Sequence, residues 1–89
     1  MLINVIKAEY LGEFKISLSF SNAESVVVDL RSTIYSDVRE IFKPLQNVEY
    51  FKTFRINLNT ITWDNEADFA PEFLLDLGKA QQNNTLTFA

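Results

Sequence analysis

The stretch FKISLSF at residues 14–20 alternates apolar and polar side chains at every position. Successive side chains of an extended backbone point to opposite sides, so two phenylalanines, an isoleucine and a leucine share one face. The lysine and two serines between them share the other face, which we expect to be solvated. A period of two with one apolar face is typical of a half-buried strand in an antiparallel sheet. The stretch therefore predicts a strand whose apolar face lies on the core.

A second strand is expected before this one and a third after it. Residues 2–10 and 25–30 are rich in Ile, Val and Leu and are separated from it by short breaks. The first break contains Gly12, one of only two glycines in the chain, which favours a hairpin. In the second break we expect Asn22 to take a positive φ, because its short side chain tolerates the left-handed region. The first third of the chain thus predicts three antiparallel strands.

After residue 30 the apolar side chains recur at helical spacing instead. Those that share one stripe are Ile34, Val38, Ile41, Phe42 and Leu45. Their spacing predicts a single helix with one apolar face. We expect Ser32 or Ser36 to cap its start. Pro44 is expected to end it near residues 42–43, because proline disfavours helical backbone in the residue before it.

The second half of the chain predicts shorter elements. They are one helical turn at 48–51, a strand at about 53–58, a turn at 57–59 and a short strand at 60–63. A final helix is expected to begin at Pro71, which suits a first helical position, and to stop at Gly78. Its apolar side chains are expected to cover a face of the sheet.

Together these elements predict one α+β domain. It would contain an antiparallel sheet of about five strands and two short helices, in the order β-β-β-α-β-β-α. Eighty-nine residues leave no room for a second core. We assign residues 1–80 to this single domain. Residues 81–89 are expected to be a polar tail that is either frayed or forms a short edge strand near its end.

Composition argues against several classes of function. The chain has neither His nor Cys, which removes the usual nucleophilic triads and metal ligands, and its two isolated glycines cannot form a phosphate-binding loop. A net charge of −4 with scattered basic residues argues against nucleic-acid binding. No segment approaches the roughly 20 apolar residues of a membrane span, and no signal peptide is recognised. We therefore expect a cytoplasmic protein that is not an enzyme and has no cofactor.

Five carboxylates follow one another late in the chain without a basic residue between them. They are Asp64, Glu66, Asp68, Glu72 and Asp76. The first three have the alternate spacing of a calcium loop, but Phe69 stands where that loop needs glycine and Leu75 where it needs a bidentate glutamate. We therefore expect no metal site. The structural interpretation is a solvated loop in which Asp68 caps the following turn, and an acidic edge that binds a partner is the alternative.

Trp63, the only tryptophan, precedes this acidic segment. On a short strand beside Ile61 it is expected to be a core or core-edge residue, with a hot spot for a partner as the alternative. Phe51 and Phe54 are expected on opposite faces of a strand, which would expose one of them on a sheet covered on one side. The candidate partner-binding surface comprises Trp63, Asp64, Asn65, Glu66, Asp68 and Glu72.

Several motifs resemble a known family. They are FKPL at 42–45, YF at 50–51 and TITWDNEADFAPE at 60–72, with GEF at 12–14 and VDL at 28–30. In this arrangement they are similar to the signature of the domain of unknown function 2442 family, over residues 2–77. The usual form of the longest motif is Gly-Thr-Ile-x-Trp-Pro-Asn-Gly-Ala-Asp-Leu-x-Pro-Glu. This chain has Asn59, Asp64 and Glu66 in place of its first Gly, its first Pro and its second Gly.

The resemblance implies a small, mostly bacterial α+β domain without an established catalytic residue. Members are often encoded beside another short protein, which implies a toxin–antitoxin-like or regulatory pairing. We therefore favour a non-catalytic protein-interaction or regulatory module that acts through a sheet edge or through the surface defined above. Its partner would be a small protein encoded nearby, and a homodimer is also considered. The alternative is a domain that binds a small molecule or a divalent metal through residues 64–76.

Overall fold

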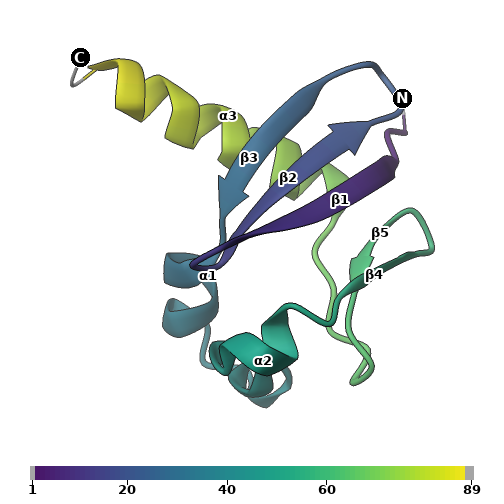
Figure 1. The fold of residues 1–89 in the computed structure, drawn as a ribbon, viewed down its shortest axis with the longest axis vertical. Coiled ribbons are helices and arrows are strands. Elements are labelled where there is room, and N and C mark those ends of the chain that lie inside the picture. Colours follow the sequence, from purple (N-terminus) through teal and green to yellow (C-terminus); the bar gives the residue numbers. More distant parts are fainter. Residues whose placement is uncertain (1, 88–89) are drawn as a thin grey trace.

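Strands β1 (Val5–Gly12), β2 (Lys15–Phe20) and β3 (Ser25–Asp29) form an antiparallel sheet in the order β1-β2-β3 (Figure 1). The computed structural model describes the backbone of residues 2–87 and the side chains of residues 2–82. The alternation predicted for residues 14–20 is confirmed, because all four apolar side chains are buried and the polar ones between them are not. Val26 and Val28 bury the matching face of β3. This sheet is therefore built on period-two patterning.

The two turns of this sheet require positive φ angles. The hairpin predicted at the first break is confirmed, and Gly12 has a φ of 96° there. In the second turn the positive φ, 73°, belongs to Ala23 and not to Asn22, so that prediction is wrong. The side chain of Asn22 is engaged elsewhere: its Oδ1 accepts from the N–H of Glu24, and its Nδ2 donates to the Glu24 carboxylate. This local bonding fixes Asn22 outside the left-handed region.

Helix α3 (Pro71–Thr87) packs against one face of the sheet, chiefly on β3 (Figure 1). The prediction that Gly78 ends this helix is wrong, because the helix continues nine residues beyond it. A Cβ at Gly78 would lie 2.6 Å from Cγ2 of Val26, so the glycine allows the helix to approach the strand closely. For the tail, where the sequence leaves fraying and a short edge strand open, the structure has α3 continuing through Thr87, and Phe88 lies outside the described residues.

The segment between the sheet and the second hairpin is divided into three short helices. They are α1 (Arg31–Ser36), the 3-10 helix η1 (Glu40–Gln46) and α2 (Val48–Phe51). The single helix predicted here is wrong, although the turn at 48–51 is confirmed. Asp37 interrupts it: Oδ1 accepts from the N–H of Arg39, whose backbone is extended, and the carboxylate also binds the Arg39 guanidinium. Val38, placed in the predicted stripe, is 88% exposed.

The predicted serine caps are also absent from the start of α1. This helix begins after Leu30, and its N-cap makes no side-chain hydrogen bond. The Oδ1 of Asp29 instead accepts from the N–H of Arg31. Ser36 lies at the other end of the helix, where its hydroxyl donates to the carbonyl of Thr33.

Strands β4 (Arg55–Asn57) and β5 (Thr60–Thr62) form a separate two-stranded sheet. A tight turn at Leu58 and Asn59, with φ angles of 51° and 78°, joins them. The N–H of Val5 donates to the carbonyl of Asn59 at 2.8 Å and connects this hairpin to β1. The α+β class and the five antiparallel strands are thus confirmed, but the strands belong to two sheets.

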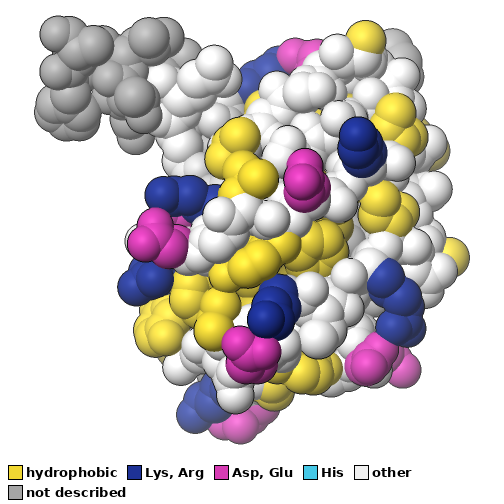
Figure 2. Space-filling model, in the orientation of Figure 1, with side chains coloured by type: hydrophobic (Ala, Val, Ile, Leu, Met, Phe, Trp, Pro, Cys, Tyr) yellow, Lys and Arg dark blue, Asp and Glu magenta, His cyan; other side chains and the backbone are white. Residues whose placement is uncertain are grey.

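The core joins both sheets to the helices through apolar and aromatic side chains. Phe51 is fully buried on α2 and Phe54 is partly buried on the segment after it, so the two do not occupy opposite strand faces. At the surface, acidic and basic side chains lie interspersed on the face shown in Figure 2. No helix within residues 2–87 is long and apolar enough to cross a membrane.

Candidate functional site

A tight turn follows β5 and forms the acidic segment. The N–H of Glu66 donates to the carbonyl of Trp63 at 2.9 Å, and the N–H of Trp63 donates to the carbonyl of Ala67 at 3.0 Å. Glu66 has a φ of 71°, which an L-residue adopts at a cost. This backbone geometry fixes where the side chains at 64–68 point.

Trp63 lies beneath this turn. Only 1% of its surface is exposed, and its Nε1 donates to the carbonyl of Phe51 at 2.7 Å. The core interpretation of Trp63 is therefore confirmed. A partner cannot contact a side chain this deeply buried, so Trp63 supports the candidate surface from below and does not form part of it.

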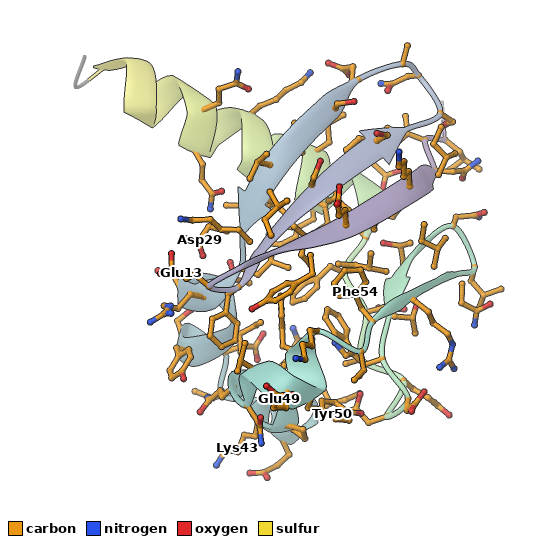
Figure 3. All side chains as sticks on the ribbon, viewed as in Figure 1. Glu13, Asp29, Lys43, Glu49, Tyr50 and Phe54 are labelled. Atoms are coloured by element: carbon orange, nitrogen blue, oxygen red, sulfur yellow. The ribbon has the colours of Figure 1, made fainter. Side chains whose placement is uncertain are left out.

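Asn65 holds the turn against the helical segment. Its Nδ2 donates to the carbonyl of Ile41 at 2.8 Å, and its Oδ1 accepts from the N–H of Ala67 at 3.1 Å. Its own N–H donates to the hydroxyl of Tyr50, which Figure 3 labels below α2. Because its amide group is bonded on both sides within the fold, Asn65 positions the loop and is not free to bind a partner.

The carboxylates of the segment remain on the surface. Asp64, Glu66, Asp68 and Glu72 are exposed. Asp64 forms an ion pair with Arg55, a basic residue that lies nine positions away in the sequence and across the β4–β5 hairpin. Asp68 pairs with Thr62 in a backbone bridge, which holds it in place without the predicted cap. Within residues 2–82 no three acidic side chains converge as a metal site would require.

A groove runs beside this segment, between the α1–η1 connection and the 66–70 loop. The residues that line it are Thr33, Ser36, Asp37, Val38, Arg39, Ile41, Phe42, Glu66, Ala67, Asp68, Phe69, Ala70 and Phe73. Its floor is a stack of three rings: Phe42 on Phe69 with centroids 5.1 Å apart, and Phe69 on Phe73 at 5.8 Å. The last ring of the stack, Phe73, is 42% exposed. Together with Val38 and Ile41 it leaves apolar surface open to solvent.

The groove carries a net negative charge. Its lining contains three carboxylates, Asp37, Glu66 and Asp68, and one guanidinium, Arg39, which leaves a net charge of −2. Arg39 is already paired: Nη2 lies 2.7 Å from Oδ2 of Asp37, and its guanidinium carbon lies 4.7 Å from the Phe42 ring centre. The hydrogen bonds from Arg39 lower the pKa of Asp37 to about 2, so this pair is ionised at neutral pH.

The side chains of this groove are suited to binding an apolar group. The two hydroxyls of the groove, on Thr33 and Ser36, have no imidazole, thiol or amine nucleophile or base beside them among the lining residues. Its aromatic floor and exposed aliphatic side chains can take up an apolar group. Sequence reasoning assigned Val38 and Ile41 to the core stripe and therefore missed this groove. The Asp-x-Arg spacing at 37–39 was the available signal for the break that exposes them.

The family model described as Protein of unknown function (DUF2442) matches residues 5–80. The chain belongs to this family. No curated protein and no solved structure matches the chain significantly. The family description names no activity, so the geometry above carries the functional argument.

The structure also accounts for two departures from the family signature. Asn59 and Glu66 stand where the signature has glycine, and both have positive φ angles, 78° and 71°. Glycine takes such angles without steric cost, whereas other residues do not. At both positions this chain has a residue that takes a positive φ at a steric cost that glycine would avoid.

Proposed function

We propose that this protein is a non-catalytic interaction module whose protein partner docks in the groove beside the acidic segment. The observation that carries the proposal is the ring stack of Phe42, Phe69 and Phe73, which begins in the core and ends at the surface. Buried apolar surface supplies affinity at an interface, and an apolar patch continuous with the core gives a rigid base for it.

The charge of the groove supports a partner of complementary chemistry. Glu66 and Asp68 form its rim and neither has an ion pair within the described side chains. An apolar side chain flanked by Lys or Arg would fill the floor and neutralise this rim. A small protein encoded beside the chain, as the family resemblance implies, is the partner we propose to test first. The association would then be regulatory, as in a toxin–antitoxin-like pair.

The proposal can be tested by co-expressing the tagged chain with its neighbouring gene product and purifying the tagged chain. We expect the product to be retained in a fixed ratio and to be lost with Glu66→Lys/Asp68→Lys or with Ile41→Glu. Glu49→Lys, an equally exposed acid on α2, is the matched control and should retain it. Thermal unfolding of each variant shows that loss of binding is not loss of fold. Retention by the groove variants, or no retention by the unmodified chain, would overturn the proposal.

A further inference from the structure

The outer edge of β1 has backbone groups without a partner. In the β2–β3 pair, the N–H of Phe20 donates to the carbonyl of Glu24, and the N–H of Leu30 donates to that of Phe14. Hydrogen-bonded and non-bonded positions alternate along antiparallel strands, so the even-numbered residues of β2 bond to β3 and the odd-numbered ones to β1.

This alternation sets the direction of the backbone groups on β1. Ala8 lies opposite Leu18 and Tyr10 opposite Ile16, both even-numbered residues of β2. The N–H and C=O groups of Ala8 and Tyr10 therefore point away from β2, toward the edge of the sheet. Among the described residues no hydrogen bond satisfies them.

The other edge of the sheet, on β3, is covered at one end only. The outward backbone groups of Val27 make no hydrogen bond within the described residues, as on β1. On β3 the carboxamide of Gln81, from α3, bonds to both backbone groups of Asp29: Oε1 accepts from its N–H at 2.9 Å, and Nε2 donates to its carbonyl at 2.8 Å. One side chain thus replaces a neighbouring strand at this end of β3. On β1 the single comparable hydrogen bond within residues 2–87 is the one from Val5 to Asn59, at the start of the strand, and the β4–β5 hairpin also contacts β1. Unpaired edges are templates for another strand, and natural proteins commonly block them.

Apolar surface lies beside the open edge. Figure 2 shows hydrophobic side chains gathered in the region between β1 and α2. The ring of Tyr10 is half-buried against Phe51, with centroids 5.9 Å apart, and Figure 3 places Phe54 in the space below β1. Leu11, at the end of the strand, is 50% exposed. A strand added at this edge would cover part of this surface.

Charges on β1 are also left without partners. Of the eight basic residues of the chain, six form ion pairs and Arg31 lies over the ring of Phe14. The remaining one is Lys7, which has no ion pair within the described side chains. Glu9, two residues along the same exposed face of β1, has none either.

We propose that a second copy of this chain pairs with β1 in antiparallel fashion, across a two-fold axis, to give a continuous six-stranded sheet. The outward groups of Ala8 and Tyr10 must then face outward groups of the other copy, which leaves only registers centred on a residue of β1. With Ala8 opposite Ala8 of the second copy, Lys7 lies opposite Glu9 of the second copy, and Glu9 opposite its Lys7.

Charge selects this register over its neighbours. Centring the axis on Glu9 would bring two glutamates directly opposite each other, which is unfavourable. Centring it on Tyr10 would place Glu9 opposite Leu11 and carry the pairing into the turn at Gly12, whose φ of 96° departs from strand geometry. The register centred on Ala8 forms two Lys–Glu pairs by symmetry and so satisfies both unpaired charges.

The test measures self-association by sedimentation velocity over a concentration series. We expect a dimer for the unmodified chain. Lys7→Glu and Glu9→Lys should each weaken the dimer about tenfold or more, because symmetry turns two attractive pairs into two repulsive ones. The double variant Lys7→Glu/Glu9→Lys should restore association close to that of the unmodified chain. Lys43→Glu, the same change on the exposed surface of η1, is the matched control and should have no effect.

A backbone variant tests the edge directly. Ala8→Pro removes the outward N–H, which makes no bond within one copy, and should leave a folded monomer. Circular dichroism reports whether the variant is folded, and the charge exchange stands as the test if it is not. A chain that stays monomeric at every concentration would overturn the proposal. If both Lys7→Glu and Glu9→Lys dimerise as the unmodified chain does, the interface lies elsewhere and the proposal is wrong.

Discussion

The three-stranded sheet with α3 and the segment from Arg31 to Ala70 are stabilised in different ways. In the sheet, backbone groups pair along regular strands, and aliphatic side chains such as Ile16 and Leu18 alternate into the core. In residues 31–70 the helices and strands are short, and side chains bond to the backbone of neighbouring elements. Side chains that bond to main-chain carbonyls there include those of Trp63 to Phe51, Asn65 to Ile41 and Thr60 to Phe69.

This difference indicates where the fold tolerates amino-acid substitutions. A hydrogen bond between two strands survives most substitutions, because the backbone supplies both partners. A bond from a particular side chain to a buried carbonyl is lost with that side chain, and the carbonyl is then left unpaired at a cost. Conservative apolar substitutions should therefore cost little folding stability in the sheet and more in residues 31–70.

The largest effect is expected at Trp63. Trp63→Ala should lower the free energy of unfolding by about 3–5 kcal/mol, the usual range for a buried aromatic side chain. Trp63→Phe keeps much of the packing but leaves the carbonyl of Phe51 unpaired, which should still cost about 1–3 kcal/mol. Ile16→Val in the sheet is the comparison and should cost about 0.5–1.5 kcal/mol. Urea unfolding measures all three, and equal costs for Trp63→Phe and Ile16→Val would contradict the contrast between the regions.

Gly78 in α3, which packs on the sheet, should tolerate substitution as poorly as residues 31–70 do. Gly78→Ala would favour the helix by about 1 kcal/mol on intrinsic propensity alone. The contact with Val26 outweighs this gain, because the new methyl group would overlap a branched side chain on a strand. We expect the free energy of unfolding to fall by about 1–3 kcal/mol in total. The double variant Gly78→Ala/Val26→Ala should lose less than its two single changes combined. A rise in the unfolding midpoint of Gly78→Ala would show that helix and strand are not in close contact.

A smaller effect of opposite sign is expected at Glu66. Glu66→Gly should stabilise the protein by about 0.5–1 kcal/mol, because glycine accepts the φ of 71° that strains the glutamate. Glu66→Gln keeps the strain and isolates the effect of the charge. Glu72→Gly, the same change in the first turn of α3, should instead be destabilising by a similar amount. Thermal unfolding of the three variants decides whether backbone strain lies in this turn.

The smallest effect concerns the Asp37–Arg39 pair that interrupts the helical segment. The folded pKa of Asp37, about 2, lies below its ordinary value of 3.8, and hydrogen bonds from Arg39 are the cause. Its contribution to stability is therefore complete above about pH 4 and is lost as the pH falls toward 2. We expect Asp37→Asn to lose less stability than the unmodified chain between pH 5 and 2. Parallel pH profiles for the two proteins would contradict this assignment.

How far the sequence predicted the candidate surface depends on the kind of residue. It identified the exposed acids correctly, because a charged side chain stays in contact with water unless a partner compensates its burial. It could not show that the side chain of Asn65 is hydrogen-bonded to Ile41 and Ala67. Nor could it show that Arg55 pairs with Asp64, since these contacts depend on how the folded chain brings the residues together. It placed Val38 in the core because helical spacing extends across the break that the Asp37 side chain makes.

The sequence by itself determined the α+β class and the three N-terminal strands, and it favoured a core position for Trp63. Alternation and aromatic size act through local geometry and hydrophobic burial, which need no knowledge of the remaining chain. The tertiary structure alone decided that five strands divide into two sheets and that Gly78 lies inside a helix against Val26. It also decided that Gln81 bonds to the end of β3, while the outward groups of Ala8 and Tyr10 on β1 stay unpaired within the described residues. These features depend on which parts of the chain, distant in sequence, pack together, and such contacts produce no repeating pattern of residues.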